Sequence, residues 1–142
     1  MEYTDDIHIP DDAGEYREEI ADILARIPVN WGRSIDCDKG WYEIIVRANN
    51  KIKFIDPEYK ICQIKEKFGT LRYYYESKYS FNSIEGQIIK DIIRSAEYES
   101  SHTCEVCGCK DFTTVENRSN GYWLRTLCVD CNSLRGLEKL SE

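Results

Sequence analysis

The sequence lacks the patterns that would place it in a membrane or mark a familiar catalytic site. No apolar run approaches the length of about 18 residues that a membrane-spanning helix needs, and no signal-peptide pattern is present. There is no P-loop, no G-x-G-x-x-G and no G-x-S-x-G elbow, and neither of the two histidines has an obvious Ser or Cys partner. We therefore expect a cytoplasmic protein that has no membrane partner and is not an enzyme.

An excess of positive charge is also missing. The 19 basic and 26 acidic residues give a net charge of −7, which opposes nonspecific binding to a polyanion unless the basic groups cluster. The 142 residues, of which 42% are hydrophobic, are enough to form a globular core. The composition therefore favours a small, acidic globular protein.

Cysteine is abundant, and its spacing is the most informative feature of the chain. Cys104 and Cys107 form one C-x-x-C pair, Cys128 and Cys131 form another, and twenty residues separate the pairs. In structural zinc sites with this spacing, two tight turns each present two sulfurs to one tetrahedral Zn²⁺. Because four cysteines close the coordination sphere, whereas catalytic zinc keeps an open position, we expect one structural Zn²⁺ per chain.

Other interpretations of the cysteines stand beside this one. A disulfide framework suits a small secreted chain, but the count of seven cysteines is odd and no export signal is present. His102 and Cys109 lie beside the first pair and are alternative ligands, although the two complete pairs already fill four positions. Cys37 and Cys62 stand alone, which is typical of small, buried apolar residues.

The residues around the cysteines predict a treble-clef finger over residues 101–142. Two short strands are expected at 112–116 and 122–127, joined by Asn120-Gly121 as a type I′ hairpin turn. After Cys131, Leu134 and Leu137 recur at helical spacing. A first turn, a hairpin and a second turn that opens a helix follow in the treble-clef order.

The N-terminal region is expected to begin with an acidic arm, residues 1–13, which has few apolar partners and is predicted to be a solvated tail. Asp12 with Glu15 resembles a capping box, and apolar residues then recur on one helical face until Pro28. The first helix should therefore occupy most of the stretch between Asp12 and Pro28.

Two more helices are predicted before the cysteines. One runs from about Trp41 to the Asp56-Pro57 pair, since the residue before a proline disfavours helix. The other is capped by Asn82 with Glu85. Its expected buried face consists of Ile88, Ile89, Ile92, Ile93 and Ala96.

A β-hairpin around Gly69 is predicted between these two helices, because residues 61–75 are rich in β-branched and aromatic side chains. In a regular pleat, alternate residues face opposite sides. The predicted inner set is Cys62, Ile64, Phe68, Leu71, Tyr73 and Tyr75, and the predicted outer set is Lys65, Lys67, Arg72 and Tyr74.

The predicted fold class is α+β, with three helices and the hairpin (residues 14–100) packed on the C-terminal finger. The connection between the third helix and the finger is too short for a flexibly tethered module. We therefore expect one body, in which Trp123 or Tyr122 is buried against Ile92, Ile93 or Tyr73.

Several strings resemble a family of small uncharacterised bacterial and phage proteins. They are Gly40-Trp41, Gln63-Ile-Lys-Glu-Lys-Phe-Gly-Thr-Leu-Arg-Tyr73, Thr103-Cys-Glu-Val-Cys-Gly108 and Trp123-Leu-Arg-Thr-Leu-Cys128. The resemblance covers roughly residues 36–132 and implies a phage or mobile-element setting, with the host cytoplasm as location. The finger is also similar to the GATA type, which reads DNA through a basic helix and tail. Here only Arg135 and Lys139 follow Cys131, against Glu138 and Glu142.

Three function classes follow from these features. The first is a zinc-stabilised protein-binding protein, such as a phage-type regulator or inhibitor of a host defence system. The second is a nucleic-acid or nucleotide binder that uses Lys65, Lys67, Arg72, Tyr74 and Arg125, although charged residues on a solvated strand face are common without a ligand. The third is an enzyme with a site of an unfamiliar kind.

Overall fold

The computed structural model of the chain describes the backbone of residues 7–121 and 123–141, and the side chains of residues 7–121 and 123–135. This part of the chain contains four α-helices, two 3₁₀ helices and five strands in two sheets. In chain order they are η1 (Gly14–Tyr16), α1 (Arg17–Ala25), β1 (Ile35–Asp36), η2 (Lys39–Trp41), α2 (Tyr42–Ile55), β2 (Lys60–Lys67), β3 (Thr70–Glu76), α3 (Ile84–Ser100), β4 (Glu116–Ser119), β5 (Leu124–Leu127) and α4 (Val129–Ser141).

The α+β class is confirmed, but the number of α-helices is four and not three. The fourth, α4, begins at Val129, between the two cysteines of the second pair. The sequence pattern predicts a helix only after Cys131. Because the first turn of α4 includes Cys131, this helix helps to form the cysteine site.

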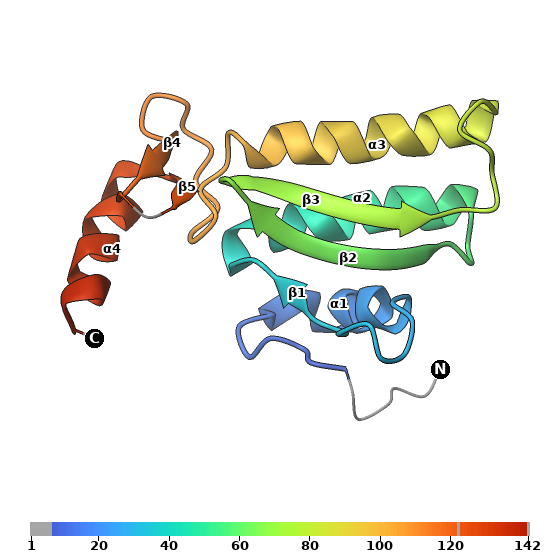
Figure 1. Ribbon diagram of the computed structural model, residues 1–142, viewed down its shortest axis with the longest axis horizontal. Helices are drawn as coiled ribbons and strands as arrows, with labels where there is room; N and C mark the ends of the chain where they lie inside the picture. The colour runs from blue at the N-terminus through green and yellow to red at the C-terminus, as the bar shows by residue number, and fades with distance from the viewer. Residues whose placement is uncertain (1–6, 122, 142) are drawn as a thin grey trace.

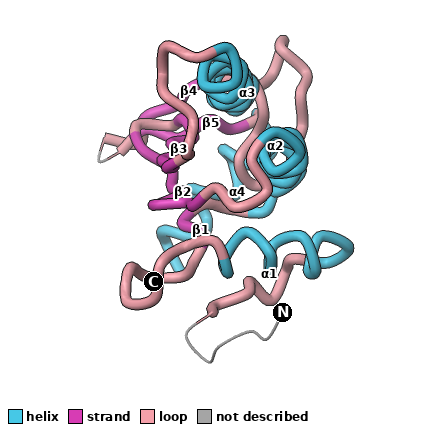
Figure 2. Tube along the Cα trace, turned by 90° about the vertical axis from the view of Figure 1, so that its right-hand side faces the viewer, coloured by secondary structure: helices cyan, strands magenta, loops and turns pink. Residues whose placement is uncertain are grey.

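The larger part of the molecule, which we call the body (residues 7–102), is a three-stranded sheet covered by helices. β1 pairs in parallel with β2, which pairs antiparallel with β3. The helices α2 and α3 lie side by side on one face of the hairpin, and α1 lies near β1 (Figures 1 and 2). The smaller part, which we call the finger (residues 103–141), lies next to the β2–β3 turn (Figure 1).

The helix α2 follows directly from its apolar pattern. Ile44, Ile45, Ala48 and Ile52 recur with the helical period and are at most 3% exposed. The helix ends at Ile55, since Asp56 precedes a proline and leaves the helical conformation. The predicted position of this helix is confirmed.

The β2–β3 hairpin departs from a regular pleat. The pairing register shifts between Ile61 and Gln63, so that Ile61 and Ile64 both face the core and Cys62 is only half-buried. Phe68 was predicted to face inward as well. It lies instead in the turn, with a left-handed φ of 55°, and is 66% exposed. A bulge and a turn therefore overturn the inner positions predicted for Cys62 and Phe68.

Two helix starts differ from the predictions. The Asp12 carboxylate does not cap α1 and instead accepts a hydrogen bond from the Tyr42 hydroxyl (3.0 Å), while a 3₁₀ turn precedes α1. In α3 the capping residue is Ser83, not Asn82, and its Oγ accepts from the Gly86 amide (3.0 Å). Ile88 on α3 is 45% exposed, which contradicts its predicted burial.

The described part of the N-terminal arm is not a solvated tail. Ile7 pairs with Arg33 in an isolated parallel bridge, and the His8 amide donates to the Arg33 carbonyl (3.0 Å). Ala13 is buried, and Ile9 packs against the core. Residues 7–13 therefore lie on the body, because their few apolar side chains find partners there. Residues 1–6 lie outside the described part of the chain.

The finger strands are shorter than predicted, and its aromatic residues face outward. Phe112 lies before β4 and is 82% exposed, while Trp123 is 61% exposed. Of Asn120 and Gly121, only Gly121 has a positive φ, which a type I′ turn would need at both positions. The predicted burial of Trp123 against the body is therefore wrong, and the side chains of Tyr122 and Leu137 lie outside the described residues.

A buried polar network ties the sheet to α1 and α2. The Tyr59 hydroxyl donates to Asn49 Oδ1 (2.5 Å) and lies 2.6 Å from the Tyr73 hydroxyl. Asn49 Nδ2 donates to Asp22 on α1, whose carboxylate also accepts from Arg26. Because Tyr59 donates to Asn49, the Tyr73 hydroxyl is the donor to Tyr59, so both tyrosine protons have acceptors.

We expect Tyr73→Phe to lower the free energy of unfolding by about 1 kcal/mol, since it removes one hydrogen bond and leaves no donor unpaired. Asn49→Leu should cost about 2–3 kcal/mol, because one hydroxyl of the tyrosine pair then lacks an acceptor. Urea unfolding monitored by fluorescence measures both. Tyr75→Phe, whose hydroxyl has no hydrogen bond among the described residues, is the neutral control. Equal losses in the first two variants would contradict the assigned donors.

Candidate metal centre

The four cysteines of the two C-x-x-C pairs come together at one point. The sulfurs of Cys104, Cys107, Cys128 and Cys131 all lie within 4.8 Å of one another, and the Cys107 and Cys128 sulfurs are 3.7 Å apart. A tetrahedral Zn²⁺ with bonds of about 2.3 Å separates its sulfur ligands by about 3.8 Å. The sulfur positions therefore fit a tetrahedral ion, and they are too far apart for disulfides.

The first pair is held by a tight turn that matches its sequence. The Gly108 amide donates to the Cys104 carbonyl (2.9 Å), and the Cys104 amide donates to the Cys109 carbonyl (2.8 Å). Gly108 has a φ of 82°, a conformation that glycine adopts without strain. The Glu105 amide donates to the Thr126 carbonyl on β5 (3.0 Å), which fixes the first pair beside the second.

The second pair lies at the start of α4. The Cys128 carbonyl accepts from the Asn132 amide (3.0 Å), so Cys128 occupies the position just before the helix and Cys131 lies in its first turn. The N-terminus of a helix carries a partial positive charge, which stabilises thiolates. Cys128 and Cys131 therefore both lie at the positive end of α4.

The thiols of the cluster differ in how readily they ionise. Burial raises the pKa of Cys104, but hydrogen bonds from the backbone of Cys107, Cys128 and Val106 outweigh it and lower the pKa to about 7. Burial, and then the neighbouring cysteine side chains, raise the pKa of Cys131, and burial likewise raises that of Cys107. One thiolate thus forms readily and opposes ionisation of the others, and a divalent cation removes this conflict.

The remaining cysteines and His102 stand apart from this cluster, which includes none of them among the described residues. Cys109 contributes its carbonyl to the first turn, as described above. The His102 ring lies against Tyr98, with centroids 4.7 Å apart. Cys37 packs against the core of the body, whereas Cys62 is the half-buried bulge residue.

The first pair rests directly on the body at Gly40. The Gly40 amide donates to the Glu105 carbonyl (2.7 Å), and a Cβ atom at Gly40 would lie 2.2 Å from the Cys104 carbonyl oxygen. Next to it, Trp41 Nε1 donates to the Thr103 carbonyl (2.9 Å) from a fully buried ring. Only glycine permits this approach, so the turn of the first C-x-x-C pair and the start of α2 fit closely together.

Arg125 lies in this junction and not on the outer hairpin face. Its guanidinium forms an ion pair with Asp38 and a longer one with Glu105 (3.4 Å). Glu105, which is 3% exposed, also accepts from the Asp38 amide (3.0 Å). Burial raises the pKa of Glu105, although Arg125 opposes the shift. These polar contacts link the finger to the η2 region of the body.

A second set of contacts joins the finger to the β2–β3 turn. Thr126 Oγ1 donates to the Gly69 carbonyl (2.5 Å), and Asn117 Nδ2 donates to the Phe68 carbonyl (3.2 Å). Lys110 forms an ion pair with Glu99, which is also bound by Arg47 of α2.

Sequence reasoning missed the residues that form the junction. The C-x-x-C pattern predicts the cysteines but gives no indication that Gly40, Asp38, Glu105 and Gly69 form the junction. Gly69 was predicted only as the turn of the β-hairpin, and Gly40 appeared only in the strings that carry the resemblance. Neither signal indicated that the strings meet in space.

The other candidate ligand residues gather on the outer face of the hairpin, as predicted. Lys65 pairs directly with Arg72, and Gln63 pairs with Tyr74, which is 44% exposed. Lys67 is opposite Thr70 and lies near the Phe68 ring (5.7 Å). Asp36 of β1 is the register partner of Lys65 on the other side. We call Lys65, Lys67, Arg72 and Tyr74 the basic face; Arg125 is not part of it.

In comparisons with protein-family models, curated proteins and solved structures, no match to this chain was found. None of the described helices is long and apolar enough to span a membrane. The four-cysteine site is therefore interpreted from its own geometry.

We expect freshly purified protein to contain one Zn²⁺ per chain by elemental analysis. Cys104→Ala and Cys131→Ala should lose the metal and the near-UV circular dichroism of the finger, because metal binding supplies most of the folding free energy of so small a unit. Cys109→Ala is the matched control and should retain both, since its sulfur lies outside the cluster. Zinc-free wild-type protein with an unchanged fold would contradict the assignment.

Proposed function

We propose that the protein is a zinc-stabilised, non-enzymatic protein-binding protein whose finger is a treble clef. The sequence of a first C-x-x-C turn, the β4–β5 hairpin and a second pair opening α4 supports the treble clef. Four sulfur ligands fill a tetrahedral Zn²⁺, which leaves no position for a reacting water or substrate. The proposed zinc therefore stabilises the fold of the finger and its contacts with the body.

The observation that carries the protein-binding proposal is an exposed tryptophan at an acidic cleft. The cleft lies where the finger meets β1, and Trp123 and Arg125 line it from the finger side. Trp123 is 61% exposed, so its ring is available to a partner. Large aromatic side chains of this kind are effective anchors in protein interfaces. The body side of the cleft is lined by Ile35, Asp36, Cys37, Asp38 and Glu66.

The charge of this cleft suits a basic segment of a partner protein. Asp36 and Glu66 form no ion pair among the described residues, whereas Asp38 and Glu105 share Arg125. A lysine or arginine side chain of a partner would meet carboxylates on one side and the Trp123 ring on the other. The resemblance to phage proteins directs the search to bacterial host proteins, with components of defence systems as the first to test.

A nucleic-acid or nucleotide binder is the second candidate, and one observation favours it. Lys65 and Arg72 are direct cross-strand neighbours, and like charges so placed repel each other, although Asp36 lies on the other side of Lys65. A bound anion would reduce this repulsion. The adjacent exposed Tyr74 offers a ring on which a base can stack. Against this candidate, Arg125 is occupied in the junction, and Arg135 donates to the Arg118 and Trp123 carbonyls in the finger (3.0 and 2.8 Å).

We expect Trp123→Ala to weaken binding to a partner captured from bacterial lysate by about tenfold or more, since removing a buried interface anchor costs about 2 kcal/mol. Phe112→Ala is the control, because Phe112 is also exposed on the finger but does not line the cleft. Titration calorimetry with the purified partner gives the affinities. Steeply salt-dependent binding of labelled DNA, RNA or nucleotide that is lost in a Lys65→Glu/Arg72→Glu variant would instead favour the second candidate.

We also propose that finger and body unfold as one unit, supported by the Gly40 contact and by the ion pairs across the junction. Removal of zinc by a chelator should then accelerate amide exchange in residues 84–96 of α3, and restoring zinc should restore protection. Full protection of these residues without zinc would mean that the two parts are independent.

A further inference from the structure

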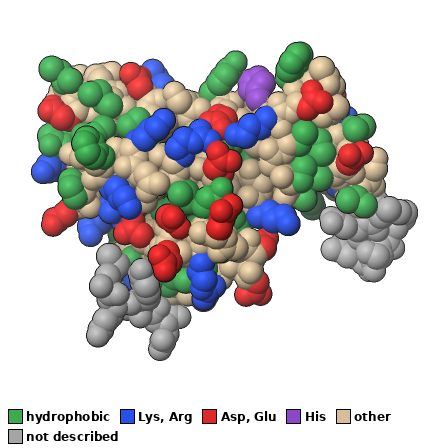
Figure 3. All heavy atoms as spheres, turned by 180° about the vertical axis from the view of Figure 1, so that it is seen from behind, with side chains coloured by type: hydrophobic (Ala, Val, Ile, Leu, Met, Phe, Trp, Pro, Cys, Tyr) green, Lys and Arg blue, Asp and Glu red, His purple; other side chains and the backbone are tan. Residues whose placement is uncertain are grey.

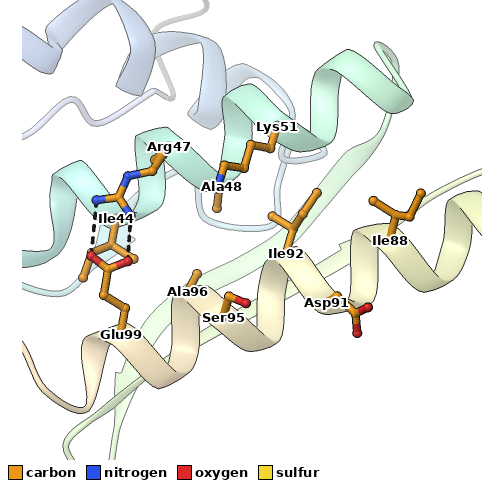
Figure 4. Close-up of a pocket in the computed structure, with 10 residues that line it drawn as sticks. All are labelled: Ile44, Arg47, Ala48, Lys51, Ile88, Asp91, Ile92, Ser95, Ala96 and Glu99. Carbon is orange, nitrogen blue, oxygen red and sulfur yellow. Dashed lines mark hydrogen bonds and ion pairs between the residues drawn. The ribbon is translucent and has the colours of Figure 1, made fainter.

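A groove runs between α2 and α3 on the side of the body away from the sheet. Its floor is apolar, and its rims carry charged side chains (Figure 4). Ala48 and Ala96 are small, which leaves the groove open between the two helices. The floor consists of Ile44, Ala48, Ile88, Ile92 and Ala96.

The two rims carry opposite charges. The α2 rim provides Arg47 and Lys51, and the α3 rim provides Asp91 and Glu99. At the end near the finger, Arg47 and Glu99 bind each other (2.6 Å and 3.2 Å), so the groove is closed there. Further along, Lys51 and Asp91 are exposed and form no ion pair among the described residues, and Asp91 points away from α2 (Figure 4).

The open end of the groove continues into exposed apolar side chains. Ile88 is 45% exposed, and Ile84, one helical turn before it, is 78% exposed. On α2, Phe54 follows Lys51 by one turn and is 89% exposed. Hydrophobic side chains gather at this end of the molecule, away from the finger (Figure 3). Helix residues of this type at helical spacing are normally covered.

We propose that this face binds the same face of a second copy of the chain. A two-fold axis along the groove places each α2 over α3 of the other copy, since a rotation about that line exchanges the two rims. The basic rim of one copy then faces the acidic rim of the other, with Lys51 close to Asp91 of the second copy. Such an interface is self-complementary, as a two-fold dimer requires.

The charge pattern distinguishes a second copy from an unrelated partner. Within one chain, Lys51 and Asp91 stand on opposite rims of the groove and do not pair with each other. The two-fold rotation brings them together twice in each dimer, while the exposed Ile84, Ile88 and Phe54 of both copies meet at the open end of the groove and lose contact with water. The four helices then form an antiparallel bundle.

The test uses two charge-reversal variants, each of which should weaken the dimer by itself, whereas a mixture of the two should form dimers. Lys51→Glu and Asp91→Lys each place two like-charged pairs in the homodimer, and each should raise the dimer dissociation constant by about tenfold or more. In an equimolar mixture of the two variants, the mixed dimer sets the two substituted side chains, which have opposite charges, against each other. Its other pair is the native one, Lys51 with Asp91, so dimers should return. Sedimentation velocity over a concentration series gives the constants, and native mass spectrometry identifies the mixed dimer.

Arg17→Glu is the matched control, because Arg17 is exposed on α1 and outside this face, and it should dimerise as wild type does. Far-UV circular dichroism and zinc content check that each variant is folded. Ile88→Asp should also give monomers, since it places a charge in the apolar part of the interface. A wild-type protein that is monomeric at all concentrations, or a mixture that does not restore dimers, would falsify the proposal and leave the groove to another partner.

Discussion

The close backbone contact between Gly40 and the first C-x-x-C turn is the constraint on which the relation of finger and body depends. A side chain at Gly40 would collide with the Cys104 carbonyl oxygen, and the Gly40 amide donates to the next carbonyl, that of Glu105. A metal bound by the four sulfurs would hold this turn in the conformation that rests on Gly40. Metal binding, where it occurs, and docking on the body would then stabilise the same conformation.

The strings that carry the resemblance meet at this junction. Gly40 and Trp41 contact the first pair, Gly69 accepts from Thr126, and Arg125 joins Asp38 to Glu105. These residues are far apart in the sequence, and each string by itself predicts a separate helix, strand or turn. Their common location shows that stretches far apart in the sequence form one junction.

The parts of the fold that depend on local sequence were predictable, and those that depend on tertiary contacts were not. The meeting of the four cysteines follows from the C-x-x-C spacing, and α2 follows from its apolar period and Pro57. The bulge at Cys62 was not predictable, since the period of two assumes regular pairing. Trp123 was expected in the core because it is apolar, but polar contacts of Thr126, Asn117 and Arg125 form the junction and leave Trp123 exposed. Ser83 caps α3 in place of Asn82 because its Oγ reaches the Gly86 amide.

The acidic cleft lies beside the four-cysteine cluster, so the proposed metal and the proposed partner would act on the same part of the finger. Glu105 lies inside the first C-x-x-C pair, Arg125 precedes Cys128 by three residues, and Trp123 lies on the same β-hairpin of the finger. All three reach the cleft only when the finger is folded, whereas Asp36 and Asp38 belong to the body. A ligand that binds only the folded form of a protein stabilises that form. A partner bound in the cleft would therefore raise the apparent affinity of the finger for zinc. By linkage, zinc would raise the affinity for the partner by the same factor. Under the proposed function, a structural metal would thus control recognition through the shape of a surface.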